Sequence, residues 1–376
     1  MIIRKLTLIN YRNYQKLIIS LNKNTNIFIG KNAQGKTNVL ESIYFLAITK
    51  SYRTTNDHIL IRSGTEFLKV KAEIKDNNIY RNMSIELSKD KKKVKINDNE
   101  VRKMADYITN LNVILISPED LEIIKGSPSE RRNFLNIELS QLSKSYVKIY
   151  NEFNKLLKIR NDYLKMSYKS SLTDKRYLDS ITENLIDREI YIYQERYKII
   201  NLLNEQIKEI YKNISGIKGL HINYETNIDF DNFETETLKR KLKEKYKRAE
   251  QKEIESGMTL YGPHRDELKF LIENQDIKFF GSQGQQKLAI IALKLSEIPI
   301  FEKMSGTKPI VLLDDIFSEL DKGNRNKVIK YIKNDIQTII TTNDIKDISK
   351  KMLDNANIYH VYNGKIIEEG EKNNGK

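Results

Sequence analysis

The hydrophobic residues near both ends of the chain follow the pattern of a layered α/β domain. Residues 26–29 and 309–313 are short continuous apolar runs, which are typical of strands buried on both faces. Residues 335–342 predict another strand. Residues 38–46 instead carry apolar side chains at helical spacing, directly after the first run. The pattern therefore predicts strands and a helix of one domain that is built from both ends of the chain.

A second pattern, alternation of apolar and polar residues, covers residues 74–87 and returns at 94–96. Alternation predicts strands with one buried face, and the polar residues 97–100 supply the turn of a hairpin. The hairpin region is dense in lysine, with Lys89, Lys91, Lys92, Lys93 and Lys95. A solvated edge strand protected by lysines is the favoured interpretation, and a surface that contacts DNA is the alternative.

The middle of the chain repeats its apolar residues every three or four positions, as helical seams do. A capping box at 127–130 predicts the helix start. One seam covers 135–165, interrupted by Arg160, and a looser one covers 178–210, after a polar break at 167–173. Two helices joined by a short link fit an antiparallel helical hairpin, and an ordinary helical subdomain without a projecting arm fits equally.

Composition narrows the class of protein. The chain has 376 residues, of which 39% are hydrophobic, so it can bury a substantial core. It has no cysteines, which excludes disulfides and thiolate metal sites, and its four histidines lack metal-ligand spacing. No apolar run approaches the roughly 20 residues that span a bilayer. Because the first residues are too charged for a signal peptide, we expect a cytoplasmic protein.

The chain is strongly basic, with a formal net charge of +14 at pH 7 and a pI of about 9.4. A partner rich in phosphate is the natural inference from this charge. The alternative is a compositional bias of a whole genome, because lysine, asparagine and isoleucine are frequent throughout the sequence. Charge alone leaves both interpretations open.

Residues 30–37, Gly-Lys-Asn-Ala-Gln-Gly-Lys-Thr, match the pattern G-x-x-x-x-G-K-[ST] between a predicted strand and a predicted helix. Gly30 and Gly35 let backbone N–H groups point inward at phosphates, and the helix N-terminus adds partial positive charge. Lys36 is expected to reach the β- and γ-phosphates of a nucleotide, and the Thr37 hydroxyl to bind Mg²⁺. A chance match in a glycine turn is the alternative.

Two acidic residues, Asp314 and Asp315, follow the apolar run 309–313. A strand that ends in a carboxylate beside a phosphate loop predicts that Asp314 holds Mg²⁺, directly or through water. Asp315 then stands where a base would orient and deprotonate the attacking water. Two acids after an apolar run are common, but together with the phosphate loop they indicate an ATPase.

Residues 282–286, Ser-Gln-Gly-Gln-Gln, precede another predicted helix. A hydroxyl residue, a glycine and amides at a helix N-terminus form a second phosphate-binding device. One nucleotide does not need two such devices from one chain. We therefore expect two chains to meet head to tail, with Ser282, Gly284 and Gln285 of one chain on the γ-phosphate held by Lys36 of the other.

The order of these motifs resembles the ABC/SMC-type ATPase plan, which continues with Ser-Glu-Leu-Asp at 318–321 and Thr-Thr-Asn at 341–343. Longer strings resemble the RecF family of bacterial recombination mediators over nearly the whole chain. These strings are residues 8–14, 117–121, 131–135, 261–268 and 281–286. The chain is thus predicted to be an α/β, ABC/SMC-type P-loop ATPase head, formed by residues 1–117 and 257–376. Residues 118–256 are predicted to be an inserted all-helical, coiled-coil-like subdomain.

The resemblance implies a protein that binds ATP, Mg²⁺ and DNA, both single-stranded and double-stranded with gaps. It also implies an ATP-dependent homodimer, a weak DNA-stimulated ATPase activity, and a part in loading RecA with RecO and RecR during recombinational repair and replication restart. The expected nucleotide contacts are Gly30, Lys31, Asn32, Ala33, Gln34, Gly35, Lys36, Thr37, Arg12, Ser282, Gly284 and Gln285. The expected catalytic residues are Lys36, Asp314 and Asp315, and the expected metal ligands are Thr37 and Asp314.

Some positions depart from the family plan or stay open. No clear Q-loop glutamine stands at 117–119, so that contact is unassigned, and Arg53 is as compatible with a surface role as with phosphate or DNA. An ATPase subunit of a membrane transporter is one alternative, but the 244 residues at positions 38–281 exceed the spacing expected there, and no membrane partner is expected. The other alternative is a DNA clamp in which ATP is a structural latch with negligible hydrolysis.

Overall fold

The structure is a computed structural model that describes the chain except residues 171, 231, 333–334, 349, 355 and 369–376. It contains two compact units. Unit 1 consists of Met1–Leu121, Ile207–Lys218 and Ser282–Lys376, and unit 2 consists of Glu122–Gln206 and Gly219–Gly281. This division groups residues 257–281 with unit 2, whereas the sequence pattern assigned them to the ATPase head.

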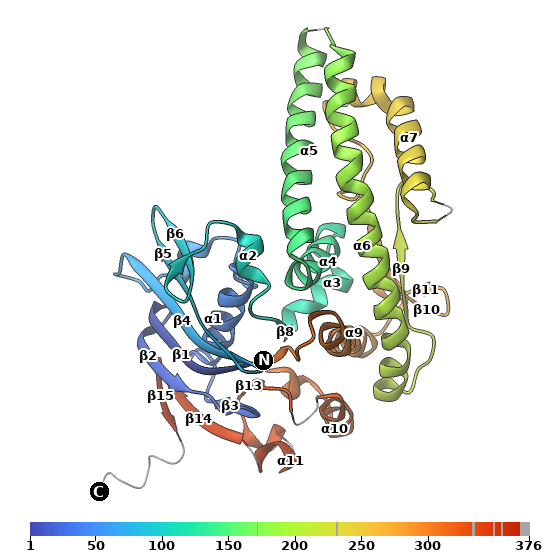
Figure 1. Cartoon of the computed structure of the whole chain (residues 1–376). Coiled ribbons are helices and arrows are strands. Elements are labelled where there is room, and N and C mark those ends of the chain that lie inside the picture. The colour runs from blue at the N-terminus through green and yellow to red at the C-terminus, as the bar shows by residue number, and fades with distance from the viewer. Residues whose placement is uncertain (171, 231, 333–334, 349, 355, 369–376) are drawn as a thin grey trace, which may run out of the picture. The chain divides into compact units, whose positions relative to one another are not determined.

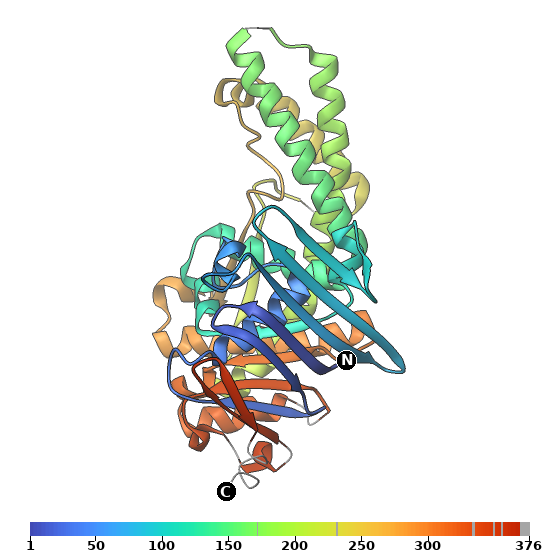
Figure 2. The same cartoon turned by 90° about the vertical axis from the view of Figure 1, so that its left-hand side faces the viewer.

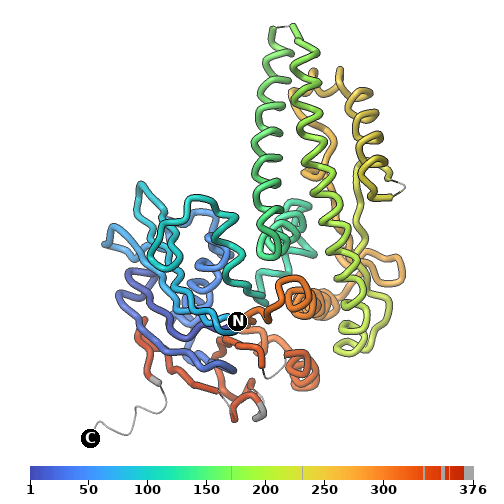
Figure 3. The backbone as a smooth tube through the Cα atoms, in the orientation of Figure 1, coloured from blue at the N-terminus to red at the C-terminus, as the bar shows by residue number. Residues whose placement is uncertain are grey.

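Unit 1 contains a six-stranded sheet in the order β15-β14-β3-β13-β12-β8 (Figure 1). Its strands are β3 (Thr25–Ile29), β8 (Val113–Ile116), β12 (Ile310–Asp314), β13 (Thr338–Thr342), β14 (Ala356–Tyr362) and β15 (Lys365–Glu368). Neighbouring strands are parallel except β14 and β15, which form an antiparallel hairpin. The three predicted buried strands are confirmed, although β13 begins at Thr338 rather than at 335. Figure 3 shows the N-terminal and C-terminal segments side by side in this sheet, where β3 pairs with β14.

The second sheet of unit 1 is antiparallel, in the order β2-β1-β4-β5-β6-β7. Its strands are β1 (Ile2–Tyr11), β2 (Tyr14–Ser20), β4 (Phe67–Asp76), β5 (Ile79–Ser88), β6 (Lys92–Ile96) and β7 (Asn99–Glu100). The predicted hairpin is confirmed by the pairing of β6 with β7, and its turn residues Asn97 and Asp98 have positive φ angles. Helix α1 (Lys36–Ile48) contacts strands of both sheets, so it lies between them.

Shorter elements complete unit 1. The helices are α2 (Met104–Ile108), α9 (Gln283–Ser305), α10 (Lys322–Tyr331) and α11 (Lys350–Leu353). The 3₁₀ turns are η1 (Asp57–Leu60), η2 (Pro118–Leu121), η3 (Ile316–Glu319) and η4 (Ile345–Asp347). Among the described residues of the whole chain, no helix combines the length and the apolar character that a membrane span needs.

Unit 2 is mainly helical. Its elements are α3 (Glu122–Lys125), α4 (Pro128–Leu142), α5 (Lys144–Ser170), α7 (Thr235–Ser256), α8 (Ile277–Phe280), β9 (His221–Glu225), β10 (Glu267–Ile272), β11 (Gln275–Asp276) and most of α6 (Lys175–Ser215). Helices α5 and α6 run antiparallel and side by side (Figures 1 and 2), and an ion pair of 3.2 Å joins Glu152 of α5 to Arg188 of α6. The two helical seams in the sequence are therefore confirmed as a helix pair.

Three local predictions in the insertion are wrong. The seam at 135–165 is broken at Ser143, whose hydroxyl accepts a hydrogen bond from the backbone of Tyr146 and so starts a new helix. Ser127 is the N-cap of α4 but makes no side-chain capping bond, because its hydroxyl contacts that of Ser129 at 2.5 Å. The insertion is also not all-helical, since β9 lies within it and pairs with β10 in a three-stranded antiparallel sheet.

Arg160, the polar interruption of the first seam, is a buried link between three segments of unit 2. Its guanidinium group donates to Glu253 of α7 at 2.6 Å, to Thr182 of α6 and to Thr259 at 2.9 Å each. A buried charge is tolerated only when it is paired and hydrogen-bonded. Arg160 therefore does not interrupt the helix; its hydrogen bonds join α5 to other segments in the interior of unit 2.

Candidate functional site

The predicted phosphate loop connects the buried strand β3 to helix α1, and its packing requires both motif glycines. Gly35 has a φ angle of 114°, and a Cβ atom there would lie 2.5 Å from Nδ2 of the Asn13 side chain. A Cβ atom at Gly30 would lie 2.4 Å from the carbonyl oxygen of Val361 in β14. The residues between them form an exposed tip, Lys31, Asn32 and Ala33. The loop is thus held in shape by β14 and by the turn between β1 and β2.

Lys36 is the first residue of α1, and its side chain folds back over the loop. Its Nζ donates hydrogen bonds to the carbonyl oxygens of Gly30 (2.7 Å) and Lys31 (3.0 Å) and to Oδ1 of Asn343 (2.9 Å). Burial lowers the pKa of Lys36, and the carboxylates of two nearby aspartates oppose that shift. The ammonium group is therefore surrounded by neutral oxygen acceptors, which an anionic oxygen can replace with a stronger, charge-assisted bond.

Thr37 and Asp314 lie together although they are far apart in the sequence. Thr37 Oγ1 donates to Asp314 Oδ1 at 2.9 Å, and Thr341 Oγ1 donates to the same oxygen at 2.7 Å. The other carboxylate oxygen, Oδ2, accepts from the Tyr52 hydroxyl at 2.9 Å. A hydroxyl and a carboxylate at the carboxyl end of a buried strand match the hard oxygen ligands that Mg²⁺ prefers. The side chains present here fit the metal ion predicted from the sequence.

Asp315 follows in a left-handed backbone conformation, with a φ angle of 51°. Its Oδ2 accepts a hydrogen bond of 3.1 Å from the side chain of Asn343, the residue that also binds Lys36. Its Oδ1 is buried and has no hydrogen-bond partner among the residues that the structure describes. Burial raises the pKa of Asp315 above its ordinary value. A carboxylate with one oxygen anchored and the other unpaired keeps a lone pair that can accept a proton or a hydrogen bond from a water molecule that reaches it.

Two further side chains, Tyr52 and Glu41, were not predicted from the sequence. Glu41 is fully buried on α1 and accepts hydrogen bonds from Arg12, at 2.6 and 2.9 Å, and from the Ser51 hydroxyl at 2.6 Å. This anchors the segment that places Tyr52 on Asp314. Burial raises the pKa of Tyr52 well above its ordinary value, and the Asp314 carboxylate adds to that effect, so the phenol remains a donor. A glutamate among the buried apolar residues of α1 was the available signal.

The turns on either side of the loop also contribute contacts that the motif does not contain. The Asn13 side chain donates to the carbonyl oxygen of Gln34 at 2.8 Å, and the Gly364 backbone donates to the same oxygen at 3.1 Å. The backbone N–H of Asn363 donates to the Gln34 side chain at 2.8 Å. Arg53 donates to Asn38 on α1 at 3.1 Å. The turn between β1 and β2 and the turn between β14 and β15 thus both form hydrogen bonds with the loop.

Ser282, Gly284 and Gln285 lie at the first turn of α9 and form a local capping box. The Ser282 hydroxyl accepts from the Gln285 backbone at 3.2 Å, and the Gln285 side chain accepts from the Ser282 backbone at 2.7 Å. Ser282 and Gly284 are exposed. In the described part of the chain, the side-chain hydrogen bonds of Ser282 and Gln285 join these two residues to each other and not to the phosphate loop.

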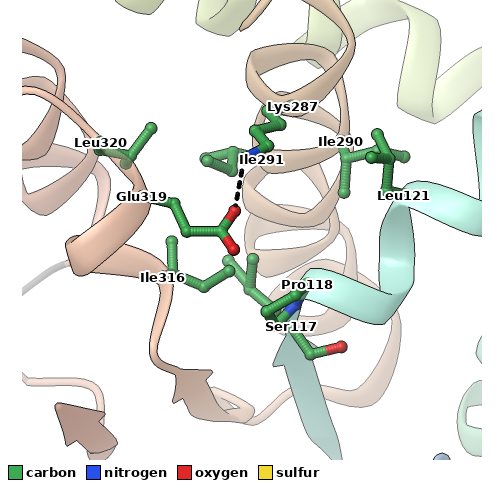
Figure 4. A pocket seen from close by; sticks show the side chains of 10 residues that line it. Ser117, Pro118, Leu121, Lys287, Ile290, Ile291, Ile316, Glu319 and Leu320 are labelled. Atoms are coloured by element: carbon green, nitrogen blue, oxygen red, sulfur yellow. Dashed lines mark ion pairs between the residues drawn. The ribbon is translucent and has the colours of Figure 1, made fainter. Parts of the chain in front are cut away.

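A pocket lies between α9, η3 and the end of β8 (Figure 4). Its lining is mainly apolar, and an ion pair of 2.8 Å between Lys287 of α9 and Glu319 of η3 crosses it. Ser117 and Pro118, where the Q-loop contact was unassigned, form another wall of the pocket. The ion pair connects the helix that begins at Ser282 to the segment that follows Asp315.

Comparison with known sequences gives a consistent result. The family described as RecF/RecN/SMC N terminal domain matches residues 2–367. The chain is 39% identical over 368 residues to the DNA replication and repair protein RecF of Bacillus cereus (strain G9842) and, separately, to that of Geobacillus sp. (strain WCH70). Each alignment covers 97% of this chain and 98% of the relative.

Solved structures agree. The chain matches the recombination mediator protein RecF of the RecFOR pathway with ATP at a TM-score of 0.90, and the same protein with ATPrS at 0.89. Both are 28% identical, and the matches cover 97% and 98% of each chain, respectively. An Smc head domain from Pyrococcus furiosus, at 18% identity and a TM-score of 0.54, shares the fold. These matches confirm the predicted ABC/SMC-type ATPase fold.

Proposed function

Because this chain belongs to the RecF family of DNA replication and repair proteins, we propose that it is an ATP-dependent DNA-binding protein of recombinational repair and replication restart. The observation that carries the proposal is the meeting of Lys36, Thr37, Asp314, Asp315 and Asn343 around one loop. The solved relatives named for ATP and ATPrS support a nucleotide at this site.

In this proposal residues 30–37 bind the triphosphate of ATP through backbone N–H groups, and Lys36 exchanges its carbonyl contacts for phosphate oxygens. Thr37 and Asp314 hold Mg²⁺, which neutralises phosphate charge when bound. Tyr52 and Thr341 keep the Asp314 carboxylate in place for that ligation. Arg12 supports the site from the side, either through Glu41 or by direct contact with the nucleotide.

Asp315 is proposed to orient the attacking water through its unpaired Oδ1, while Asn343 holds Oδ2. A slow ATPase and a latch with negligible hydrolysis remain the two versions of this function. Steady-state hydrolysis by Asp315→Asn separates them, since the substitution keeps the shape of the side chain and removes its basicity. An unchanged rate would exclude Asp315 as the base, whereas a large loss with retained ATP binding supports it.

We further propose that ATP joins two chains head to tail. The first turn of α9 carries Ser282, Gly284 and Gln285 and would meet the γ-phosphate bound by the partner's loop, with the backbone N–H of Gly284 as a donor outside the capping box. In this arrangement the nucleotide completes an interface, and single- or double-stranded DNA binds to the dimer. RecR and RecO are the proposed protein partners, and loading of RecA at gapped DNA is the proposed outcome.

Sedimentation velocity with ATP, ADP or no nucleotide tests the proposal. We expect a dimer at micromolar protein only with ATP, and a monomer in the other two conditions. The variant Lys36→Ala should stay monomeric with ATP, because the loop no longer holds the triphosphate. A wild-type chain that binds ATP and remains a monomer would contradict the shared site.

A further inference from the structure

The antiparallel sheet of unit 1 has two chemically opposite faces. One face is buried against α1 and consists of apolar side chains such as Leu6, Leu8, Val70 and Ile85. The other, here called the lysine face, carries seven lysines and two glutamates. They are Lys5, Lys16, Lys69, Lys71, Lys75, Lys93, Lys95, Glu73 and Glu86. In Figure 2 the blue and teal strands of this sheet lie nearest the viewer.

Strand register places these lysines in rows across the sheet. One row runs Lys16, Ile9, Lys69, Glu86, Lys93 over five neighbouring strands. The next row runs Ile18, Thr7, Lys71, Ser84, Lys95. Neighbouring strands are about 4.8 Å apart, and residues two positions apart on a strand are about 6.6 Å apart. The ammonium groups therefore form a two-dimensional array rather than a single cluster.

Most of this positive charge is not neutralised within the chain. Glu86 pairs with Lys69 at 2.7 Å and with Lys95 at 3.3 Å, and Lys71 approaches Asp98 at 4.0 Å. Among the described residues, no carboxylate lies within 4.0 Å of the ammonium group of the remaining four lysines, Lys5, Lys16, Lys75 and Lys93. Like charges on neighbouring strands repel each other, so the sheet keeps this array at a cost in stability.

Protection of a sheet edge does not explain the array. Lysines that prevent edge-to-edge association are expected on the outermost strands. Here β2 and β7 are the outermost strands, and only Lys16 of the seven lies on either of them. The four lysines on β1 and β4 lie on inner strands that are paired on both sides. Lys93 and Lys95 lie on β6, whose outer side pairs with β7 only at Lys95 and Ile96.

We propose that the lysine face binds the sugar-phosphate backbone of DNA. This inference rests on the proposed DNA-binding function and names the surface that performs it. Lysine is a mobile point charge that contacts phosphate without reading base edges, which suits sequence-independent binding. The large hydrophobic residues exposed on this face, Ile18, Phe67 and Tyr80, stand on three different strands, so the face lacks the continuous apolar strip with which a surface inserts into a membrane.

Tyr80 marks one end of the lysine face. Its ring is 58% exposed, and both Arg4 and Lys75 lie over it at 5.6 Å from the ring centroid. Cation–π contact of this kind orders long basic side chains without neutralising them. The end of the face therefore presents two cations that are held in position and remain available to phosphate.

The test is DNA binding, in the presence of ATP and Mg²⁺, by the full chain with Lys5→Gln, Lys16→Gln and Lys93→Gln combined. These substitutions remove charge from three strands and leave every ion pair of the lysine face intact. For a duplex, the slope of log K against log salt is negative, and each lost phosphate contact reduces its magnitude by about 0.9. The magnitude of the slope should therefore be smaller by about 2.7 in the triple variant. Affinity at about 0.1 M salt should fall at least tenfold. The matched control, Lys303→Gln, Lys330→Gln and Lys346→Gln, also removes three charges from unit 1 but from α9, α10 and η4.

Each outcome decides the proposal. A slope and affinity equal to those of the wild-type chain, or an equal loss in the control, would overturn the lysine face while leaving the DNA-binding function intact. A wild-type chain that does not bind DNA would overturn both. Binding to vesicles containing phosphatidylserine that depends on the three lysines and is not displaced by duplex DNA would assign the face to membranes instead.

A second measurement keeps the proposal testable if the triple variant folds poorly. Lysine acetylation of the wild-type chain, followed by mass spectrometry, is compared with and without duplex DNA. DNA should protect Lys5, Lys16 and Lys93 and leave Lys303, Lys330 and Lys346 reactive. Equal reactivity of the two sets in the presence of DNA would overturn the proposal.

Discussion

The two proposed phosphate-binding devices of unit 1, the loop at 30–37 and the turn at 282–285, are built in opposite ways. The loop at 30–37 is shaped by contacts from distant segments, including Asn13, Asn343 and Gly364. Among the described residues, the side-chain hydrogen bonds of Ser282 and Gln285 stay within their own capping box, and Ser282 and Gly284 are exposed. A site that is complete within one chain needs many tertiary contacts, whereas a half-site that meets another molecule needs local order and open donors. The difference supports a nucleotide shared between two chains.

The largest effect is expected when the phosphate loop at 30–37 loses its lysine. Lys36→Ala should weaken ATP binding by about 100-fold, because a charge-assisted contact to phosphate of about 1.5–3 kcal/mol is lost. Calorimetric titration with ATP measures it. Lys31→Ala is the matched control, since Lys31 contributes only its carbonyl oxygen to the contacts of the loop. A similar loss in both variants would mean that the exposed tip, rather than Lys36, dominates binding.

A smaller effect tests the support of the proposed metal ligands. Tyr52→Phe removes the hydrogen bond to Asp314 Oδ2 and should weaken Mg²⁺-dependent nucleotide binding about tenfold, as expected for a residue that orients a metal ligand. Titration of Mg²⁺ at fixed ATP measures it. With EDTA present, the variant and the wild-type chain should bind ATP equally. A loss that persists without metal would show that Tyr52 acts on the loop and not on Asp314.

The local half-site should respond differently. Ser282→Ala removes an N-cap worth about 1 kcal/mol and should weaken the ATP-dependent dimer about fivefold, while ATP binding by the monomer is unchanged. Sedimentation across a range of protein concentrations measures the dimer constant. Asn56→Ala removes a comparable cap from η1 and is the control. If Ser282→Ala weakens monomeric ATP binding instead, then the turn belongs to the same chain's site and the comparison fails.

The smallest effect concerns the ion pair between α9 and the segment that follows Asp315. Lys287→Gln breaks the ion pair with Glu319, whose side chain is 35% exposed. Such a pair contributes about 0–1 kcal/mol, so the midpoint of chemical unfolding should barely move. Lys287→Arg retains the pair and is the control. A large destabilisation confined to Lys287→Gln would indicate that the pocket in Figure 4 depends on this ion pair for its packing.

The sequence was informative where a short motif marks a position along the chain. The loop at 30–37, the acids at 314 and 315 and the helix start at 282–286 are short motifs that stand out in the sequence, and the fold confirms where they lie. The errors arose where a local pattern was ambiguous. Ser143 resembles any polar position of a helical seam, yet its hydroxyl starts a new helix. β9 is too short to stand out between long helices.

The lysines of the β5–β6 hairpin show what a local sequence pattern cannot predict, namely which side of the sheet each lysine faces. They looked alike in the sequence, but alternation along β6 separates them. Lys92 points to the buried side and pairs with Asp57 at 2.8 Å, whereas Lys93 and Lys95 belong to the lysine face. A solvated edge strand is thus the wrong description for Lys92, because its ammonium group is held inside by a carboxylate. Only the pairing with β5 decides which lysines share a face.

The sequence by itself determined the class of the protein, its nucleotide motifs and its family, because those depend on short strings and on periodicity. Tertiary structure alone decided that Tyr52 holds Asp314, that Asn343 bridges Lys36 and Asp315, and that Gly364 closes over the loop. These partners are separated by up to several hundred positions, and no local sequence pattern shows which strand ends lie side by side. The order of parallel strands β3, β13 and β12 brings them together, since the carboxyl ends of neighbouring parallel strands meet at one edge of the sheet.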